Sequence, residues 1–451
     1  MNPFVQIKSI ALTNFKNVES GTVDFKNNVL GVYGQNGSGK TALVDALEIF
    51  QVVARGDALP PFVENLITCE KPYAQCTLVF ELNNGEGVVE SLVEYSFRIQ
   101  RSQLGGVEVC YEQVSEKKSG KRSRSLIVCL DKGLQEKWIS PAADWAFAFS
   151  TKDSAIKFEV IKELTSREHR SMLFSKDLAE FVKLQGKNPA EKLEIVDKIR
   201  TFAQANLFVI KNNGNGPFSL DFSFPFNFRH TEGKNLSYGN VGISLVQPTV
   251  FPKLLYTLIE NAFTEMNVVL QEIVPGLKVV VDPKGPQQTP DGADGVRFEL
   301  LSKKGEAKPI PLRYESEGVK KIISILSILI SVYNNPATCL AVDELDAGIY
   351  EYLLGEILNI VDEKAKGRLL FTSHNLRPLE MIKKDSLVFT TTNATNRYIR
   401  LSGIQTNNNP RNVYLRSISL GGQKEEIYQE TNHFKIDRAF RKAGKLNDVQ
   451  N

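Results

Sequence analysis

Four residues near the start of the chain, Gly34, Gly39, Lys40 and Thr41, have the types and spacing of a phosphate-binding loop, G-x-x-x-x-G-K-T. Glycines let successive backbone N–H groups curve around phosphate oxygens, and a following helix adds the positive end of its dipole. Lys40 would reach the β- and γ-phosphates, and the Thr41 hydroxyl would ligate Mg²⁺. A plain glycine turn would explain the glycines but not Lys40 and Thr41. The predicted loop residues are Gly34, Asn36, Gly37, Ser38, Gly39, Lys40 and Thr41.

A second chemically competent pair, Asp343 and Glu344, directly follows the apolar run 339–342. Adjacent carboxylates at the end of a buried strand are suited to binding Mg²⁺ and activating water next to a phosphate group. Asp343 would hold Mg²⁺, mostly through water, and Glu344 would be the base that orients an attacking water. An acidic turn after a buried strand is the structural alternative.

These side chains need alternating strands and helices to bring them together. Apolar runs at 28–33, 339–342 and 369–372 predict strands, and residues 42–50 and 322–333 predict helices, which gives an α/β fold. Further strands are predicted at 74–82, 95–99, 106–114, 125–130 and 413–416, the first four as antiparallel hairpins. Helical periodicity covers 166–210, 247–274 and a basic amphipathic segment at 434–446. The apolar stripe within 247–274 fits core packing or a partner-facing surface.

Residues 7–18, I-x-x-I-x-L-x-N-F-K-N-V, followed by G-x-N-G-S-G-K-T, resemble the opening of ABC-type ATPases of the RecF, SMC and OLD kind. This resemblance implies an ABC-type head with a mixed central sheet, an antiparallel β-subdomain and a helical lobe. It divides the chain into an N-terminal lobe (1–150), a helical insertion lobe (151–275), a segment with the later motifs (276–380) and a short C-terminal segment (381–451).

The same resemblance implies roles for residues in the second half. Ser316-Glu317-Gly318 resembles a reduced ABC signature that would hold the γ-phosphate of ATP on the opposite subunit, although a serine helix cap looks identical. Asp343-Glu344 matches the Walker B motif, and Asp346 falls in the D-loop that crosses the dimer interface. His374 is placed like the switch histidine that contacts the γ-phosphate. The Q-loop glutamine stays open between Gln51 and Gln75.

Composition and charge limit which partners and which cellular compartment are expected for the chain. A net charge of +3 over 451 residues implies no strong polyelectrolyte partner. Five cysteines without a C-x-x-C pair indicate reduced thiols, and no signal peptide or apolar run near 18 residues is visible. We therefore expect a cytoplasmic protein with no membrane segment. The basic stretch 117–124 fits either a nucleic-acid contact or a solvated hairpin tip.

The resemblance is strongest to stand-alone OLD-type ATPases of bacterial anti-phage operons, first the PARIS-type ATPase subunit and second the Septu ATPase. It implies a homodimer or higher oligomer built from ATP-sandwich dimers, with ATP and Mg²⁺, that controls a separate effector nuclease, with a phage protein as a possible trigger. The tail has no acidic cluster of the kind that a TOPRIM nuclease needs. Two alternatives stay open. One is a RecF-like DNA-repair ATPase, whose basic groove would form on dimerisation from residues 117–124 with Lys320 and Lys321, and the other is a nucleotide-sensing scaffold with slow hydrolysis.

Overall fold

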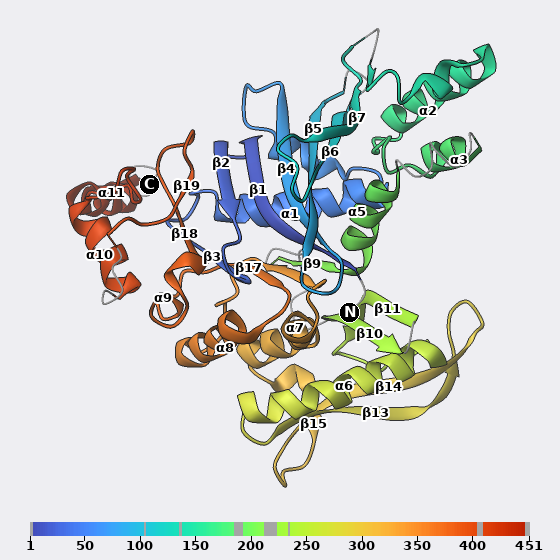
Figure 1. Ribbon diagram of the computed structural model, residues 1–451. Helices are drawn as coiled ribbons and strands as arrows, with labels where there is room; N and C mark the ends of the chain where they lie inside the picture. The colour runs from blue at the N-terminus through green and yellow to red at the C-terminus, as the bar shows by residue number, and fades with distance from the viewer. Residues whose placement is uncertain are drawn as a thin grey trace.

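Two sheets of different type form the body of the molecule, which Figure 1 shows as a computed structural model. The structure describes residues 3–102, 105–134, 138–184, 193–211, 223–232, 235–403 and 409–446. A central, mostly parallel sheet and a long antiparallel sheet enclose helix α1 (Lys40–Arg55). This arrangement confirms the predicted α/β fold with a mixed central sheet and an antiparallel β-subdomain.

The central sheet carries the chemistry-bearing turns at the ends of its strands. Its order is β19-β18-β3-β17-β16-β9, and every neighbouring pair is parallel except β18 and β19. Because helices or sheet cover both faces, its central strands are fully buried and read as continuous apolar runs. The strands are β3 (Val29–Tyr33), β9 (Leu207–Ile210), β16 (Cys339–Val342), β17 (Arg368–Thr372), β18 (Leu387–Thr390) and β19 (Tyr398–Ile399).

The antiparallel sheet has the order β2-β1-β4-β5-β6-β7-β8. Burial alternates along β4, as expected for a strand with one face on the core and one toward solvent. The predicted hairpin strands at 74–82, 95–99, 106–114 and 125–130 all fall within this sheet. Its strands are β1 (Phe4–Phe15), β2 (Val18–Asp24), β4 (Tyr73–Asn83), β5 (Val89–Arg101), β6 (Val107–Lys118), β7 (Ser125–Asp131) and β8 (Ile139–Ser140).

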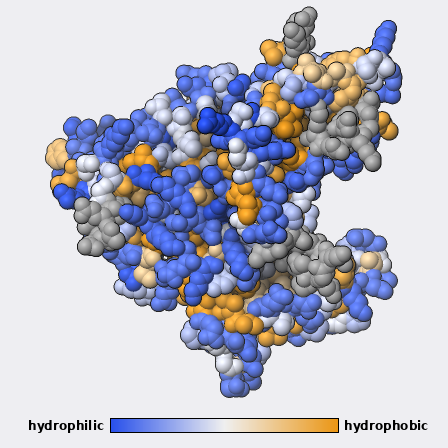
Figure 2. All heavy atoms as spheres, viewed as in Figure 1, coloured by the Kyte–Doolittle hydropathy of each residue, from blue (hydrophilic) through white to orange (hydrophobic). Residues whose placement is uncertain are grey.

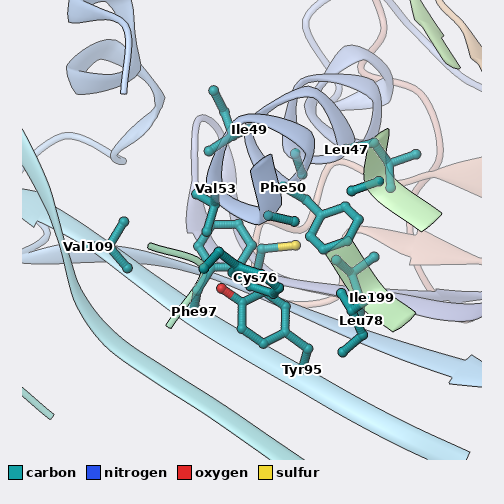
Figure 3. Close-up of a cluster of buried hydrophobic side chains, with 14 of the residues drawn as sticks. Leu47, Ile49, Phe50, Val53, Cys76, Leu78, Tyr95, Phe97, Val109 and Ile199 are labelled. Carbon is teal, nitrogen blue, oxygen red and sulfur yellow. The ribbon is translucent and has the colours of Figure 1, made fainter. Parts of the chain in front are cut away.

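One hydrophobic core fills the space between α1 and the antiparallel sheet, and Figure 3 shows part of it. Phe50 of α1 lies 5.7 Å from Phe80 and 6.0 Å from Tyr95, measured between ring centroids. Helix α5 (Glu194–Ala205) closes this core, with the ring of Phe202 edge-on to Phe80. Because α1 begins at the phosphate loop, this core fixes the direction in which the loop's helix points.

A second core covers the other face of the central sheet. Helices α6 (Lys253–Ile273), α7 (Glu317–Asn334) and α8 (Glu351–Lys364) pack there. The predicted stripe of 247–274 lies within α6, which contributes Ile259, Phe263 and Met266 to this core. Core packing is therefore the main role of that stripe.

The interval 151–275 is more varied than the expected helical lobe. It contains α2 (Lys152–Arg167), α3 (Lys176–Leu184) and α5, but also β9, which belongs to the central sheet. A hairpin of β10 (Ser223–Glu232) and β11 (Asn235–Ser244) and strand β12 (Thr249–Pro252) precede α6. Strand β12 joins a small antiparallel sheet with β13 (Leu277–Gln288), β14 (Asp294–Lys304) and β15 (Ile310–Pro311).

The C-terminal segment contains α9 (Pro378–Met381), α10 (Pro410–Leu420) and α11 (His433–Leu446). The strand predicted at 413–416 is wrong, because those residues lie inside α10. Asn409 caps that helix by accepting a hydrogen bond from the Arg411 amide, and Pro410 occupies its first turn. Short 3₁₀ helices lie at Pro61–Leu66, Ala146–Phe149, Leu312–Tyr314 and Lys384–Ser386. Within the described ranges, no helix has the length and apolar character needed to cross a bilayer.

Candidate nucleotide-binding site

The predicted phosphate loop joins the end of β3 to the start of α1. Gly37 and Gly39 have φ angles of 73° and 98°, in the left-handed region that favours glycine. A Cβ atom on Gly34 would lie 1.7 Å from the Thr390 Oγ1 atom, so only glycine fits there. The loop thus presents backbone N–H groups beside a helix N-terminus, which is a site suited to a phosphate.

Lys40 lies over this loop with its ammonium group turned inward. Its Nζ donates hydrogen bonds to the carbonyls of Gly34 (2.8 Å) and Gln35 (3.0 Å). Burial lowers the pKa of Lys40, and the nearby carboxylates, Asp343 first among them, oppose that shift. The ammonium is held at the loop, where phosphate oxygens can compete with the two carbonyls for its protons.

Asp343 and Glu344 follow β16 and face the phosphate loop. The Thr41 hydroxyl donates to Asp343 Oδ1 at 3.3 Å, so the two groups predicted to hold Mg²⁺ already lie together. Hydroxyl and carboxylate oxygens are the hard ligands that Mg²⁺ prefers, and this donor set fits the ion. Glu344 has a φ of 47°, an uncommon backbone conformation for a residue other than glycine.

Thr372, at the end of β17, holds the two acidic residues in place. Its hydroxyl donates to Asp343 Oδ1 at 2.6 Å and accepts a hydrogen bond from the Glu344 amide at 2.8 Å. Thr372 is fully buried. Sequence reasoning missed this residue, although its place directly before Ser373-His374 on a predicted strand was a usable signal.

His374 follows the same strand and is tied to Asp346. The amides of His374 and Asn375 both donate to Asp346 Oδ2, at 3.1 and 2.9 Å. Burial and then the positive charge of Lys40 lower the pKa of the His374 imidazole, so the ring is neutral at pH 7. Asp346 Oδ1 is buried and has no hydrogen-bond partner among the described residues. Asp346, predicted to face a second subunit, therefore also positions the His374 segment within its own chain.

A cavity of about 730 Å³ lies between these groups, within the size range of small-molecule sites. It brings together Lys40, Thr41, Asp343, Glu344 and His374, with Asn36, Gly37 and Gly39 of the predicted loop. Sequence reasoning missed other lining residues, and these are Lys16, Asn17, Ala42, Glu64, Asn65, Ile67, Cys69 and Arg101. Two other residues of the loop, Gly34 and Ser38, do not line the cavity, and the Ser38 hydroxyl is 2.5 Å from that of Thr390.

The predicted signature lies at the start of α7, outside the lining of that cavity as the described residues form it. Ser316 caps the helix by accepting a hydrogen bond from the Val319 amide at 3.3 Å, and Ser316 and Glu317 are exposed. A Cβ atom on Gly318 would lie 1.9 Å from the carbonyl oxygen of Gly348. Gly318 is therefore required for close packing of the signature helix against the D-loop.

Neither candidate for the Q-loop glutamine lines the cavity. The Gln51 side chain donates to the carbonyls of Ala203 (3.0 Å) and Leu207 (2.6 Å), which joins α1 to α5 and β9. Gln75 bonds to Thr77, Ser96 and Arg98 on the polar face of the antiparallel sheet. Both glutamines have structural contacts in place of a contact with the phosphate loop.

Residues from the C-terminal segment support the phosphate loop from behind. The Tyr398 hydroxyl donates to the Gly39 carbonyl at 2.8 Å, and the Arg397 guanidinium donates to the Asn17 carbonyl at 2.5 Å. Gln35, within the loop, accepts a hydrogen bond from the Gln429 amide at 3.1 Å. Sequence reasoning assigned no role to these contacts, which join residues more than 350 positions apart.

Comparison with known proteins agrees with this geometry. Residues 9–214 match the family model described as an AAA domain. A stretch of 63 residues is 35% identical to the DNA replication and repair protein RecF of Deinococcus radiodurans, covering 14% of this chain and 17% of that protein.

Among solved structures, the chain is similar to two SMC head domains. One, from Pyrococcus furiosus, is bound to the C-terminal domain of ScpA; its identity is 12%, its TM-score 0.42, and 88% of this chain and 96% of that chain are covered. The other, from Thermotoga maritima, is 13% identical with a TM-score of 0.38, and the match covers 88% of this chain and 99% of that chain. Because residues 9–214 include the phosphate loop, this part of the chain is similar to AAA domains both in sequence and in the arrangement of the loop.

Proposed function

We propose that this protein binds ATP with Mg²⁺ and hydrolyses it at a composite site that a second copy of the chain completes. The observation that carries this proposal is the separation of the motifs. The phosphate loop, Asp343, Glu344 and His374 share one cavity, while Ser316 and Glu317 are exposed and lie outside its described lining, next to the buried Gly318. An exposed serine at a helix N-terminus is suited to a phosphate, and a second copy could bring it to the open side of the cavity.

Each residue at the site has a definable role in this reaction. Lys40 and the loop amides bind the phosphates, and Thr41 and Asp343 would hold Mg²⁺, which neutralises charge on the phosphates when bound. Glu344 orients the attacking water and accepts its proton, while Thr372 fixes the backbone from which Glu344 projects. His374, neutral at pH 7, donates a hydrogen bond toward the γ-phosphate position without adding charge.

A mixing experiment tests the composite site. Lys40→Ala should remove phosphate binding, and Ser316→Arg should block the face that is offered to the partner, so each variant alone should lack ATPase activity. In a mixed dimer, the intact phosphate loop of the Ser316→Arg copy meets the intact Ser316 of the Lys40→Ala copy. An equal mixture should recover about a quarter of the wild-type rate, since half the dimers are mixed and each has one complete site.

The control for this experiment mixes either variant with itself at the same total concentration, which should stay inactive. Full activity of Ser316→Arg alone would refute a site that needs the signature. A mixture that stays inactive, although both variants fold and the Ser316→Arg protein binds ATP, would refute completion by a second copy.

For the biological role, we propose that the ATP-driven dimer controls a separate effector, a nuclease toxin, in bacterial anti-phage defence. What supports this is the resemblance of the motif set to stand-alone OLD-type ATPases. Purification from the native operon context, with identification of the co-purifying protein and nucleic acid, tests it. The proposal requires a partner whose activity changes when Glu344→Gln replaces the wild type, and fails if no encoded partner binds.

A RecF-like role on DNA is the second candidate, favoured by the 35% identity to RecF over 63 residues. Its predicted basic groove needs correction, because Lys320 and Lys321 are buried, with 1% and 6% of their surface exposed. Burial lowers the pKa of Lys321, which lies in the field of Asp343. Of the residues predicted to form the groove, only those at 118–124 are exposed. ATP-dependent DNA affinity that falls steeply with salt would support this candidate.

A further inference from the structure

Helix α2 (Lys152–Arg167) has two apolar faces, and the residues that the structure describes cover only one of them. Phe158, Ile161 and Thr165 are buried, and Phe158 stacks on Trp138 with ring centroids 4.9 Å apart. The other face carries Ile156, Val160 and Leu164, which are 53%, 49% and 43% exposed. A surface helix normally needs one apolar stripe to attach it to its domain, so the second stripe calls for a second partner.

The exposed stripe is continuous and edged by charges. Ile156, Val160 and Leu164 recur every four residues, which places them in one row along the helix. The surface hollow beside them has a volume of about 530 Å³ and is edged by Lys152, Glu159, Glu163 and Arg167. Helix α2 lies at the periphery of the molecule in Figure 1, and apolar residues gather in the same region of Figure 2.

The charges along α2 indicate what covers the stripe. Positive and negative side chains alternate along the exposed face, so the face lacks the excess of basic residues that an anionic membrane or a nucleic acid attracts. Asp153 lies at one end of the stripe and Arg167 at the other, each on the same face as Val160. A helix with an acidic residue at its first turn and a basic one at its last is complementary to its own antiparallel copy.

We propose that α2 pairs with α2 of a second copy, antiparallel, about a two-fold axis at Val160. In this register Val160 meets its own copy, and Ile156 meets the partner's Leu164 at both ends of the stripe. Asp153 then lies opposite the partner's Arg167, and the two-fold axis makes this ion pair twice. The arrangement buries the apolar row and brings the partner's Arg167 to Asp153, which also pairs with Lys157 of its own helix at 2.8 Å.

This contact uses no residue of the nucleotide site, so it is independent of the proposed ATP-dependent dimer. One helix pair is small beside the ~1,600 Å² of a standard interface, and we expect a dissociation constant on the order of 10 µM. A chain with two separate self-contacts can build assemblies larger than a dimer when ATP closes the other contact. The α2 pair would then connect one ATP-bound dimer to the next.

The first test measures self-association without nucleotide by analytical ultracentrifugation, up to about 100 µM. Val160→Glu should raise the dissociation constant by at least tenfold, because two carboxylates would meet at the axis. Val268→Glu is the matched control, since Val268 is a 64% exposed valine on α6, and it should leave association unchanged. A wild-type protein that stays monomeric over this range overturns the proposal, as does equal association of the Val160→Glu protein.

A charge exchange then tests the antiparallel register. Asp153→Arg places arginine against arginine at both ends of the pair, and Arg167→Asp places aspartate against aspartate, so each variant alone should associate at least tenfold more weakly. Mixed together they should form the heterodimer, because every end now joins an arginine to an aspartate. Recovery in the mixture separates this pairing from damage to the fold, and no recovery refutes the register.

Disulfide trapping gives a second measurement that does not depend on affinity. Val160→Cys in a Cys69→Ser background removes the exposed native thiol and places the new one at the proposed axis. Mild oxidation should give a covalent dimer in the absence of ATP. Val268→Cys in the same background is the control and should not form one; equal trapping by both variants counts against the α2 contact.

Discussion

Replacing Thr372 with valine should separate the positioning of the acidic pair from the binding of phosphate. The change keeps the shape of the side chain and removes only its hydroxyl. That hydroxyl donates to Asp343 at 2.6 Å and accepts from the Glu344 amide at 2.8 Å, in a site where Thr372 is fully buried. The variant therefore leaves Asp343 Oδ1 with the longer 3.3 Å hydrogen bond from Thr41, and it removes the acceptor that the Glu344 amide has in Thr372.

The size of the effect follows from these two lost bonds. A hydrogen bond to a charged group contributes about 1.5–3 kcal/mol, and an unsatisfied buried amide costs about 1–3 kcal/mol. The summed loss of about 2.5–6 kcal/mol should lower the melting temperature by roughly 5–20 °C, if the unfolding unit is a domain of about 150–250 residues. Since Glu344 loses the bond that fixes its backbone, ATP turnover should fall about 10- to 100-fold.

Three measurements check this prediction: thermal melting, steady-state phosphate release, and binding of a fluorescent ATP analogue. Binding should change less than tenfold, because Lys40 and the loop glycines are untouched. Thr372→Ser is the matched control, since it keeps the hydroxyl and should retain most of the turnover. If the valine variant melts and turns over like the wild type, or if serine is as damaging as valine, Thr372 does not position the acidic pair.

Three further predictions concern neighbouring residues. Glu344→Gln should bind ATP and accumulate as a nucleotide-bound dimer in size-exclusion chromatography, because the base that activates water is gone; normal turnover would sink the assignment. Gly318→Ala should lower the free energy of unfolding by about 1–3 kcal/mol and should also lower ATPase activity, because its Cβ would lie 1.9 Å from the Gly348 oxygen. Gly133→Ala is the control: its Cβ would meet only the flexible Asp131 carboxylate, so this variant should melt like the wild type. Folding lowers the pKa of His374 from its ordinary 6.5, so the unfolded chain binds more protons than the folded chain just below that pH. The folded state should therefore lose stability as the pH falls below 6.5. In the His374→Gln variant, the melting temperature should depend less on pH in that range.

The part of the site that sequence predicts is the part carried by short local signals. The phosphate loop, Asp343-Glu344 and His374 each follow an apolar run, and the carboxyl ends of parallel strands meet at one edge of a sheet. The three turns therefore converge once the fold is known to be α/β. The roles of these residues in catalysis stay predictions.

Other features depend on packing that no local pattern encodes. Strand β9 has only four residues and follows a helix, so its apolar run reads as more of that helix. Four residues at 413–416 are too few to distinguish strand from helix, and the stronger signal was the Asn409-Pro410 start of α10. Lys320 and Lys321 read as a surface pair, yet tertiary packing buries both behind the signature.

The hydrogen bonds of Asp346 and the close packing of Gly318 on Gly348 connect the movements of three segments of the chain. Asp346 holds the backbone that carries His374, while Gly348, two residues later, leaves no room for movement at the start of α7. The His374 turn, the D-loop and the start of α7, which we propose to contact the nucleotides of a dimer, are thus joined to one another within one chain. A displacement of the His374 turn by the γ-phosphate would be transmitted to the surface that the neighbouring copy touches, so each site would report its occupancy to the other.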